Sequence, residues 1–204
     1  MGSDDCGSRM TDGNRREYFR VDDSVVLDYR VISEQELPAL VDDLRRRSPT
    51  RFTAAAEFAA TSRHMNRLLH KIRRVSPDLV RYLEAVDGKL NTLARLFLLE
   101  ELDPPQQTAR EVSLSAGGIG FRARGPLTAG DLVELKLVLL PSHTGVLTFG
   151  RVVYCEPCSA GDAEFPHFVA IEFDQLRETD RELLVRHLLG RQNAARERPS
   201  DGDD

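Results

Sequence analysis

The pattern of apolar and polar positions changes its period twice along the chain of 204 residues. From Val21 to Ile32 apolar and polar residues alternate, which is typical of a half-buried strand. Ser33-Glu34-Gln35-Glu36 then fits a capping box and predicts a short helix that ends near Arg46. Period two returns at Thr108, and a closing amphipathic helix is predicted over about 177–192. The strands predicted between these points cover residues 108–113, 118–123, 131–140, 146–156 and 166–174.

The segment 51–102 has helical periodicity and contains a seven-residue repeat. The repeat positions are Phe58, Met65, Ile72, Leu79, Val86 and Leu93, with Leu68, Val75, Tyr82 and Leu96 three residues after four of them. Further apolar residues widen this stripe, which favours a bundle of three or four helices over a two-stranded coil. Because the apolar phase continues through Pro77, the pattern predicts a kink or a collinear restart there rather than a hairpin.

A collinear helix of this segment would be roughly 78 Å long, more than a small β-domain can cover. The stripe therefore predicts self-association as a homo-oligomer, with packing against the β-domain of the same chain as the alternative. Short strands separated by turn signals suggest an antiparallel barrel or sandwich of about 105 residues. The chain thus divides into a β-domain, a helical insertion over 33–106, and disordered tails over 1–13 and 193–204.

Composition narrows the function. The net charge of −5 argues against binding to a nucleic acid polymer, and no apolar run is long enough to span a membrane. Three cysteines and no secretory signal fit a cytoplasmic protein. Cys155 and Cys158 form a single C-x-x-C with no second pair of ligands, so no metal site is expected. No catalytic constellation is visible, and neither an enzymatic activity nor a cofactor is expected.

Two short motifs carry candidate binding chemistry. Arg15, Arg16 and Arg20 precede the first strand, and Ser113, Ser115 and Gly118 surround a glycine turn between two later strands. These motifs resemble the R-R-x-x-x-R and D/N-x-S-x-x-G motifs of the PilZ domain family of bacterial cyclic di-GMP receptors. The first matches in full, whereas Ser113 replaces the acidic or amide residue of the second. The resemblance covers about residues 14–32 and 107–192 and implies a six-stranded antiparallel barrel closed by a C-terminal helix.

The resemblance implies that cyclic di-GMP binds to these six residues. Guanidinium groups suit a ligand with two phosphates and two guanines, because they bind phosphate bidentately and donate to guanine O6 and N7. Ser113 is a weaker acceptor for guanine N–H groups than a carboxylate, so we expect binding to be weakened roughly 10–100-fold. The resulting hypothesis is a receptor that couples the nucleotide to an unknown protein effector, assembled as a trimer or tetramer.

Two alternatives stay open at this point. In the first alternative, the protein is a nucleotide-independent oligomeric scaffold, as in PilZ-like proteins that carry long heptad helices and degenerate nucleotide motifs. In the simplest interpretation, the arginines only keep the junction soluble and the serine–glycine segment is an ordinary hairpin turn.

Overall fold

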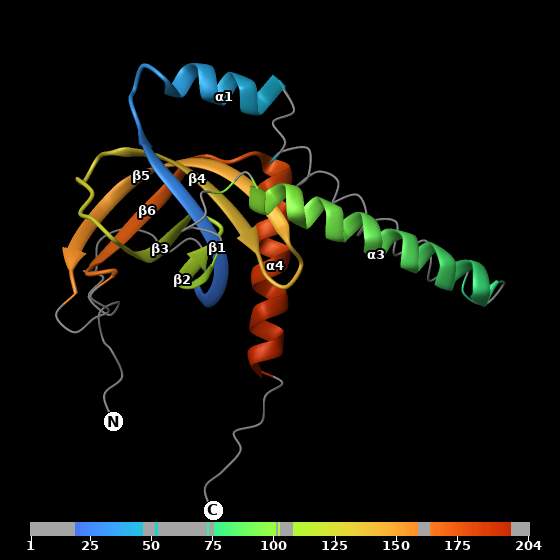
Figure 1. Ribbon diagram of the computed structural model, residues 1–204. Helices are drawn as coiled ribbons and strands as arrows, with labels where there is room; N and C mark the ends of the chain where they lie inside the picture. Colours follow the sequence, from blue (N-terminus) through green and yellow to red (C-terminus); the bar gives the residue numbers. More distant parts are fainter. Residues whose placement is uncertain are drawn as a thin grey trace, which may run out of the picture.

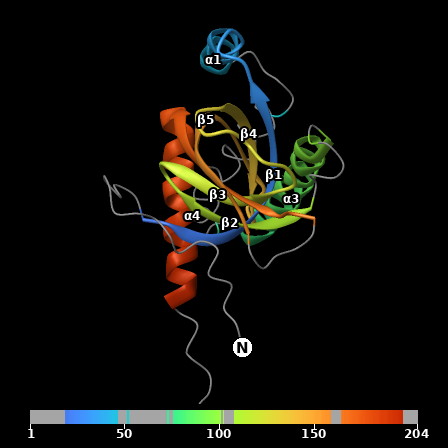
Figure 2. The ribbon, with the colours of Figure 1, turned by 90° about the vertical axis from the view of Figure 1, so that its left-hand side faces the viewer.

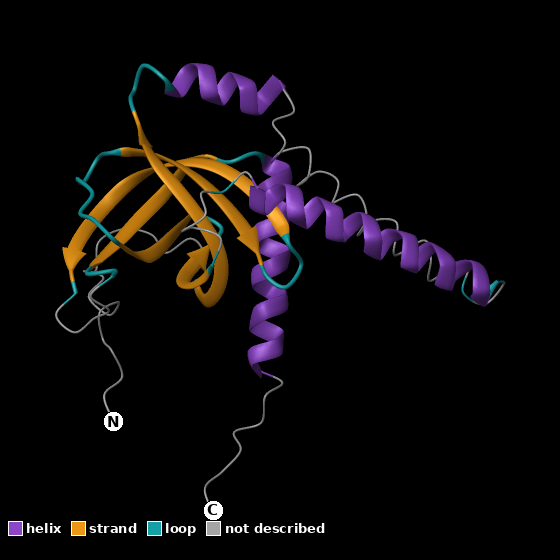
Figure 3. Ribbon diagram, viewed as in Figure 1, coloured by secondary structure: helices purple, strands orange, loops and turns teal. Residues whose placement is uncertain are grey.

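The computed structural model describes residues 19–46, 52, 73, 76–100, 102, 108–158 and 164–196. These residues form a closed antiparallel barrel with strand order β1-β2-β3-β6-β5-β4, and three helices lie around it (Figures 1 and 3). The strands are β1 (Val21–Ile32), β2 (Ala109–Ser115), β3 (Gly118–Ala123), β4 (Leu132–Leu139), β5 (Thr144–Pro157) and β6 (His167–Gln175). The six predicted strands are all present, with ends within two residues of the predicted ones.

The helices occupy different sides of the barrel. Helix α1 (Leu37–Arg46) lies over one end, while α3 (Pro77–Glu100) and α4 (Glu178–Arg196) lie on opposite sides in Figure 2. Helix α4 ends at Arg196 rather than near residue 192, so the first residues of the predicted C-terminal tail are helical. Helix α3 projects away from the barrel, and its C-terminal end is the end nearer to the strands (Figure 1).

The capping box forms as predicted at the junction between β1 and α1. The backbone N–H of Ser33 donates to the Glu36 carboxylate at 2.8 Å, and the Glu36 N–H donates to the Ser33 hydroxyl at 3.3 Å. The hydrogen bond from the Ser33 backbone is the largest cause that holds the pKa of Glu36 below its ordinary value. This local exchange of bonds satisfies backbone groups that a helix start would otherwise leave open, and it ends the first strand.

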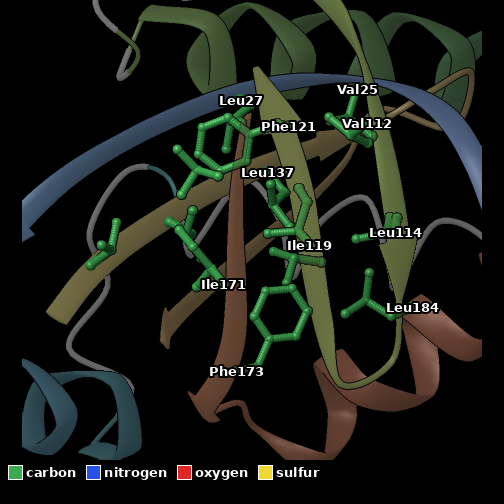
Figure 4. Packing of buried hydrophobic residues seen from close by; sticks show 14 of the residues in the cluster. Val25, Leu27, Val112, Leu114, Ile119, Phe121, Leu137, Ile171, Phe173 and Leu184 are labelled. Carbon is green, nitrogen blue, oxygen red and sulfur yellow. The ribbon is translucent and has the colours of Figure 1, made fainter. Parts of the chain in front are cut away.

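The main core fills the barrel interior. Alternate residues of every strand point inward, and Leu184 and Leu188 of α4 close one end of the same cluster (Figure 4). The residues labelled in Figure 4 are Val25, Leu27, Val112, Leu114, Ile119, Phe121, Leu137, Ile171, Phe173 and Leu184. Six of them, including Leu114 and Ile119, are 0% exposed, and this explains why strict alternation in the sequence predicted the strands so closely.

A second hydrophobic cluster lies on the outer face of β1, β4 and β5. Helix α1 contributes Val41 and Leu44 to it, and the helical segment contributes Phe52, Leu98 and Leu102. Strand β4 is therefore buried on both faces, which accounts for its almost continuous apolar sequence. The helical insertion is thus attached to the barrel through its ends rather than standing apart from it.

The path of the chain before α3 differs from the prediction. Phe52 and Leu98 share the second cluster, although a collinear helix would place them about 69 Å apart. Arg73 also forms an ion pair with Glu84, across Pro77. The predicted kink or collinear restart at Pro77 is therefore wrong, because the chain reverses direction before α3. Pro77 is the first residue of α3, a position where its missing N–H costs no helical hydrogen bond.

Candidate functional site

The two predicted motifs meet where β1 begins. Arg20 lies just before β1, and its guanidinium donates to the carbonyl oxygen of Ser113 on β2 at 3.5 Å. Asp22 and Ser113 are register partners in the adjacent strands. Arg15 and Arg16 lie outside the described residues. The structure therefore brings the third arginine of the first motif to the first position of the second motif.

Ser115 has a structural task in the turn between β2 and β3. It is only 4% exposed. Its hydroxyl donates to the carbonyl oxygen of Gly118 at 3.2 Å and accepts the N–H of Gly117 at 3.3 Å. A further backbone bond runs from the N–H of Phe173 to the carbonyl oxygen of Gly117 at 2.9 Å. The Ser115 hydroxyl thus stabilises the turn itself, and the backbone of Gly117 joins the turn to β6.

Gly118 is required by the packing of the barrel. A Cβ atom at this position would lie 2.4 Å from the carbonyl oxygen of Ile171 in β6. Since that oxygen belongs to the backbone of a central strand, it cannot move aside cheaply. The serine and glycine that resemble the second motif therefore have a structural reason to be present, independent of any ligand.

Helix α4 fastens both motif segments. The Arg181 guanidinium donates to the carbonyl oxygen of Ala116 in the β2–β3 turn at 3.1 Å. On β1, the buried carboxylate of Asp23 lies 2.5 Å from Nε2 of His187 and 2.7 Å from Nε of Arg191. The contact to Arg191 is an ion pair without the alignment of a hydrogen bond. One helix thus contacts the segment after the arginine motif and the turn of the second motif.

Opposing effects act on the Asp23 carboxyl group. Burial, the largest of them, raises its pKa, while the hydrogen bonds from His187 and the Ser24 backbone and the charges of His187 and Arg191 lower it. The lowering effects outweigh burial, so the pKa of Asp23 lies below its ordinary value of 3.8. Asp23 is therefore ionised at neutral pH and anchors α4 to the barrel.

Sequence reasoning found the motif residues but missed this anchor. Asp23 is one more acidic residue in an alternating strand, and its partners His187 and Arg191 follow more than 160 positions later. One signal was present: His187 falls on the apolar face of the predicted closing helix, with Leu184 and Leu188. A polar residue on a buried face needs a partner, but the sequence does not say which one.

The cysteine pair shows no metal-binding arrangement. Cys155 accepts the N–H of Leu127 through its sulfur at 3.4 Å, and neither Cys155 nor Cys158 forms a disulfide. Among the residues that the structure describes, no group of three His, Cys, Asp or Glu side chains could hold a metal ion.

The heptad residues of α3 form an apolar surface. Leu79, Tyr82, Leu93 and Leu96 are each about half exposed or more, and Val86 between them is partly buried. Leu90 and Phe97 widen this surface, which we call the α3 stripe. The other predicted oligomer residues, Phe58, Met65, Leu68, Ile72 and Val75, lie outside the described residues.

A second, different face of α3 is buried within the protomer. Its buried residues are Val80, Ala94 and Leu98, and at 100° per residue this face lies roughly 115° around the helix from the stripe. Two apolar faces are typical of a helix that packs against two neighbours, and only one face of α3 is buried within the protomer.

The comparisons with known proteins agree with this architecture. Residues 92–190 match the family model of the PilZ domain. This stretch contains five of the six barrel strands, while β1 comes from before the helical insertion. Residues 92–190 therefore resemble a PilZ domain, and β1, which lies before the matched residues, completes the barrel. No curated protein gives a significant match.

Two solved structures resemble the chain. One is a protein from Xanthomonas campestris described as a tetrameric PilZ domain self-assembled through a helical bundle. It is 16% identical, with a TM-score of 0.52 over 90% of this chain and 92% of that one. The other is the inhibitor of motility of Bacillus subtilis, 22% identical with a TM-score of 0.35 over 44% of each chain. At 16% identity, the likeness to the Xanthomonas campestris protein concerns the fold alone.

No helix among the described residues has the length and hydropathy needed to cross a membrane.

Proposed function

We propose that this protein is a cyclic di-GMP-binding PilZ adaptor that assembles as a homo-oligomer and passes the nucleotide signal to a protein partner. The observation that supports nucleotide binding is the contact of Arg20 with Ser113, since it joins the two motifs at one place on the barrel. In this proposal Arg15, Arg16 and Arg20 bind the phosphates and guanine edges, a task that suits their planar, doubly donating groups.

The α3 stripe supports the assembly. Leu79, Tyr82, Leu93 and Leu96 expose an apolar surface on a helix that already buries its other apolar face. A contiguous apolar surface of this kind is typical of a protein–protein contact. A second copy of the chain offers an identical stripe, and a closed bundle of three or four such helices would cover it. The assembly described for the Xanthomonas campestris protein is a precedent within the same fold.

The signalling step rests on α4. Arg181 holds the turn of the second motif, and His187 and Arg191 hold Asp23, three residues after Arg20. A ligand that repositions these segments would change what α4 and the neighbouring surface present to a partner. A PilZ domain in this role is a regulatory module, and the proposal needs no catalytic step.

Calorimetric titration of the full chain with cyclic di-GMP tests the nucleotide proposal. We expect saturable heat for the wild type and a strong loss of binding for Arg16→Ala and Arg20→Ala. Arg81→Ala, an exposed arginine on α3, is the matched control and should bind like the wild type. An absence of heat at tens of micromolar wild-type protein would sink the proposal.

A nucleotide-independent scaffold is the second candidate, and two observations favour it. Ser113 replaces the expected carboxylate or amide, and Ser115 and Gly118 are already engaged in holding the barrel together. The same titration separates the two candidates, because a scaffold binds no nucleotide while keeping its oligomeric state.

Light scattering tests the assembly in either case. Leu79→Asp and Leu93→Asp place a charge in the α3 stripe and should dissociate the oligomer, because burying an unpaired carboxylate is costly. Thr92→Asp adds the same charge to an exposed α3 position outside the stripe and should leave the mass unchanged. A wild type that is monomeric at all concentrations would end the assembly proposal.

A further inference from the structure

A row of outward-facing residues crosses the barrel surface beside Ser113. By strand register, Asp22 pairs with Ser113, Ser113 with Gly120, Gly120 with Ala170, and Ala170 with Tyr154. Residues that flank the row in β2, β3 and β6 point into the core, and so does Cys155 beside Tyr154, so the row lies on the outer surface. Two of its members, Gly120 and Ala170, have almost no side chain. The row therefore leaves a shallow floor between Ser113 and Tyr154.

Two aromatic rings cover this floor. A Cβ atom on Gly120 would lie 2.7 Å from Cζ of Phe168, so the Phe168 ring lies directly over the glycine. The Tyr154 and Phe168 rings are 6.2 Å apart at 30° to one another, and Ala170 below them is 3% exposed. Both rings are themselves only partly buried. They form a nearly continuous aromatic surface, which we call the Tyr154–Phe168 platform.

The charges around the platform distinguish a base from a phosphate. Glu156 is the register partner of Phe168, and Glu172 is the partner of Gly118, and both carboxylates are exposed. Each carboxylate repels a phosphate, whereas either one can accept the N1–H and N2–H groups of a guanine. Arg122, the partner of Phe168 in β3, can donate to guanine O6 and N7.

The platform is also at a suitable distance from the arginine motif. Ser113 and Ala170 are separated by two strand spacings, about 10 Å. A dinucleotide whose phosphates contact arginines near Ser113 can reach across β3 with one base. Nucleobases stack on aromatic side chains in many proteins, because each base has a π-face and ring stacking needs no particular hydrogen-bond pattern.

Resting on the proposed function, we propose that one guanine of cyclic di-GMP stacks on the Tyr154–Phe168 platform, while the phosphates are held by the arginine motif. This contact would supply binding energy that Ser113, in place of an acidic or amide residue, does not supply. It also assigns a ligand-contact role to Phe168 and Tyr154 of β6 and β5, outside both motifs.

The absence of tryptophan from the chain makes a direct test possible. In the full-length protein, Phe168→Trp introduces a single indole at the platform, and a stacked guanine quenches indole fluorescence. We expect titration with cyclic di-GMP to lower this emission with the same midpoint as the calorimetric titration. Thr92→Trp, at an exposed α3 position, is the matched control, and its emission should not change.

Affinity supplies the second measurement. Phe168→Leu keeps an apolar side chain over Gly120 but removes the stacking surface, and we expect it to weaken binding about tenfold. Thr92→Trp should keep the wild-type affinity. Circular dichroism and a thermal melt show whether the barrel of each variant is intact, and if Phe168→Leu is unfolded the Trp variant decides alone.

The outcomes separate this inference from the proposed function. Wild-type protein without any nucleotide heat overturns the proposed function and the inference with it. Wild-type binding that depends on Arg16, together with unquenched Phe168→Trp and an unchanged affinity of folded Phe168→Leu, overturns only the inference. Quenching confined to the platform tryptophan supports both.

Discussion

In the barrel, each strand directs its alternate apolar side chains into a closed interior, whereas α3 leaves Leu79, Tyr82, Leu93 and Leu96 facing outward. Leu114 and Ile119 in the barrel are fully buried, while Leu93 is 50% exposed. The two regions contain similar apolar residues, but only the barrel encloses its own. A barrel supplies its own partners, whereas a single helix with two apolar faces can satisfy only one of them within the described chain.

This difference indicates which process the apolar residues of each region stabilise. Burial inside the barrel contributes to the folding of one protomer. Exposed apolar surface on α3 contributes little to that folding and is available for association instead. Substitutions that are chemically matched but placed in one region or the other should therefore affect different measurements.

The largest effect should come from a pair of leucine truncations. Leu114→Ala opens a cavity in the barrel core and should lower the free energy of unfolding by about 2–5 kcal/mol. Leu93→Ala removes the same atoms from the α3 stripe and should act mainly through assembly. Urea unfolding at several protein concentrations checks this. The Leu114→Ala shift should appear at every concentration, and that of Leu93→Ala should depend on concentration.

Similar large shifts for both variants at high dilution would contradict the contrast between the two regions, since the α3 stripe would then contribute to the fold of the protomer itself.

The second prediction concerns the anchor between barrel and α4. Asp23→Asn keeps the shape but removes the charge that His187 and Arg191 contact, and should cost about 2 kcal/mol at pH 7. Because the folded pKa of Asp23 lies below its ordinary value of 3.8, ionised Asp23 stabilises the fold above that pH. This contribution disappears as the pH falls through the folded pKa.

Urea unfolding at pH 7 and below pH 4 measures the contribution of ionised Asp23 to stability. The stability difference between wild type and Asp23→Asn should narrow in acid. Asp22→Asn, at the exposed neighbouring position, is the control and should stay within about 0.5 kcal/mol of the wild type. A difference that is constant, or that widens in acid, would refute the assigned sign.

Two glycines extend the comparison to the backbone. Gly118→Ala would place a Cβ 2.4 Å from a strand carbonyl oxygen and should destabilise the barrel by about 1–3 kcal/mol. Gly88 in α3 has no atom within 4 Å of such a Cβ, so Gly88→Ala should stabilise by about 0.5–1 kcal/mol. Opposite shifts of the thermal midpoint are expected. A harmless Gly118→Ala would mean that the glycine is kept for a ligand rather than for packing.

The smallest effect is expected at the capping box, which joins β1 of the barrel to α1. Ser33→Ala removes the hydroxyl that accepts the Glu36 N–H at the start of α1 and should cost about 1 kcal/mol. Since α1 covers the outer face of β1 and β4, the loss should appear as faster amide exchange in α1 before global unfolding. Uniform exchange across barrel and helix would show that α1 unfolds only with the barrel.

Much of this architecture could be predicted because its signals are local. The alternation in Val21–Ile32, the exchange of bonds between Ser33 and Glu36, and the turn around Gly117 depend on neighbouring residues. In the candidate site, the Arg20 guanidinium contacts the carbonyl oxygen of Ser113 and so joins the two motifs, while the ligand-binding roles of these residues stay a prediction. The packing role of Gly118 could not be predicted, because it depends on β6, which follows more than 45 residues later.

By itself, the sequence determined the strands, the capping box, the closing helix and the two motifs, since periodicity and turn chemistry act over a few residues. Only the tertiary structure decided the reversal of the chain before α3, because the heptad phase across Pro77 is compatible with a straight path and with a hairpin. It also decided the pairing of Asp23 with His187 and the meeting of Phe168 with Gly120. These contacts join residues far apart in the chain, and strand register and helix packing, rather than local preference, choose their partners.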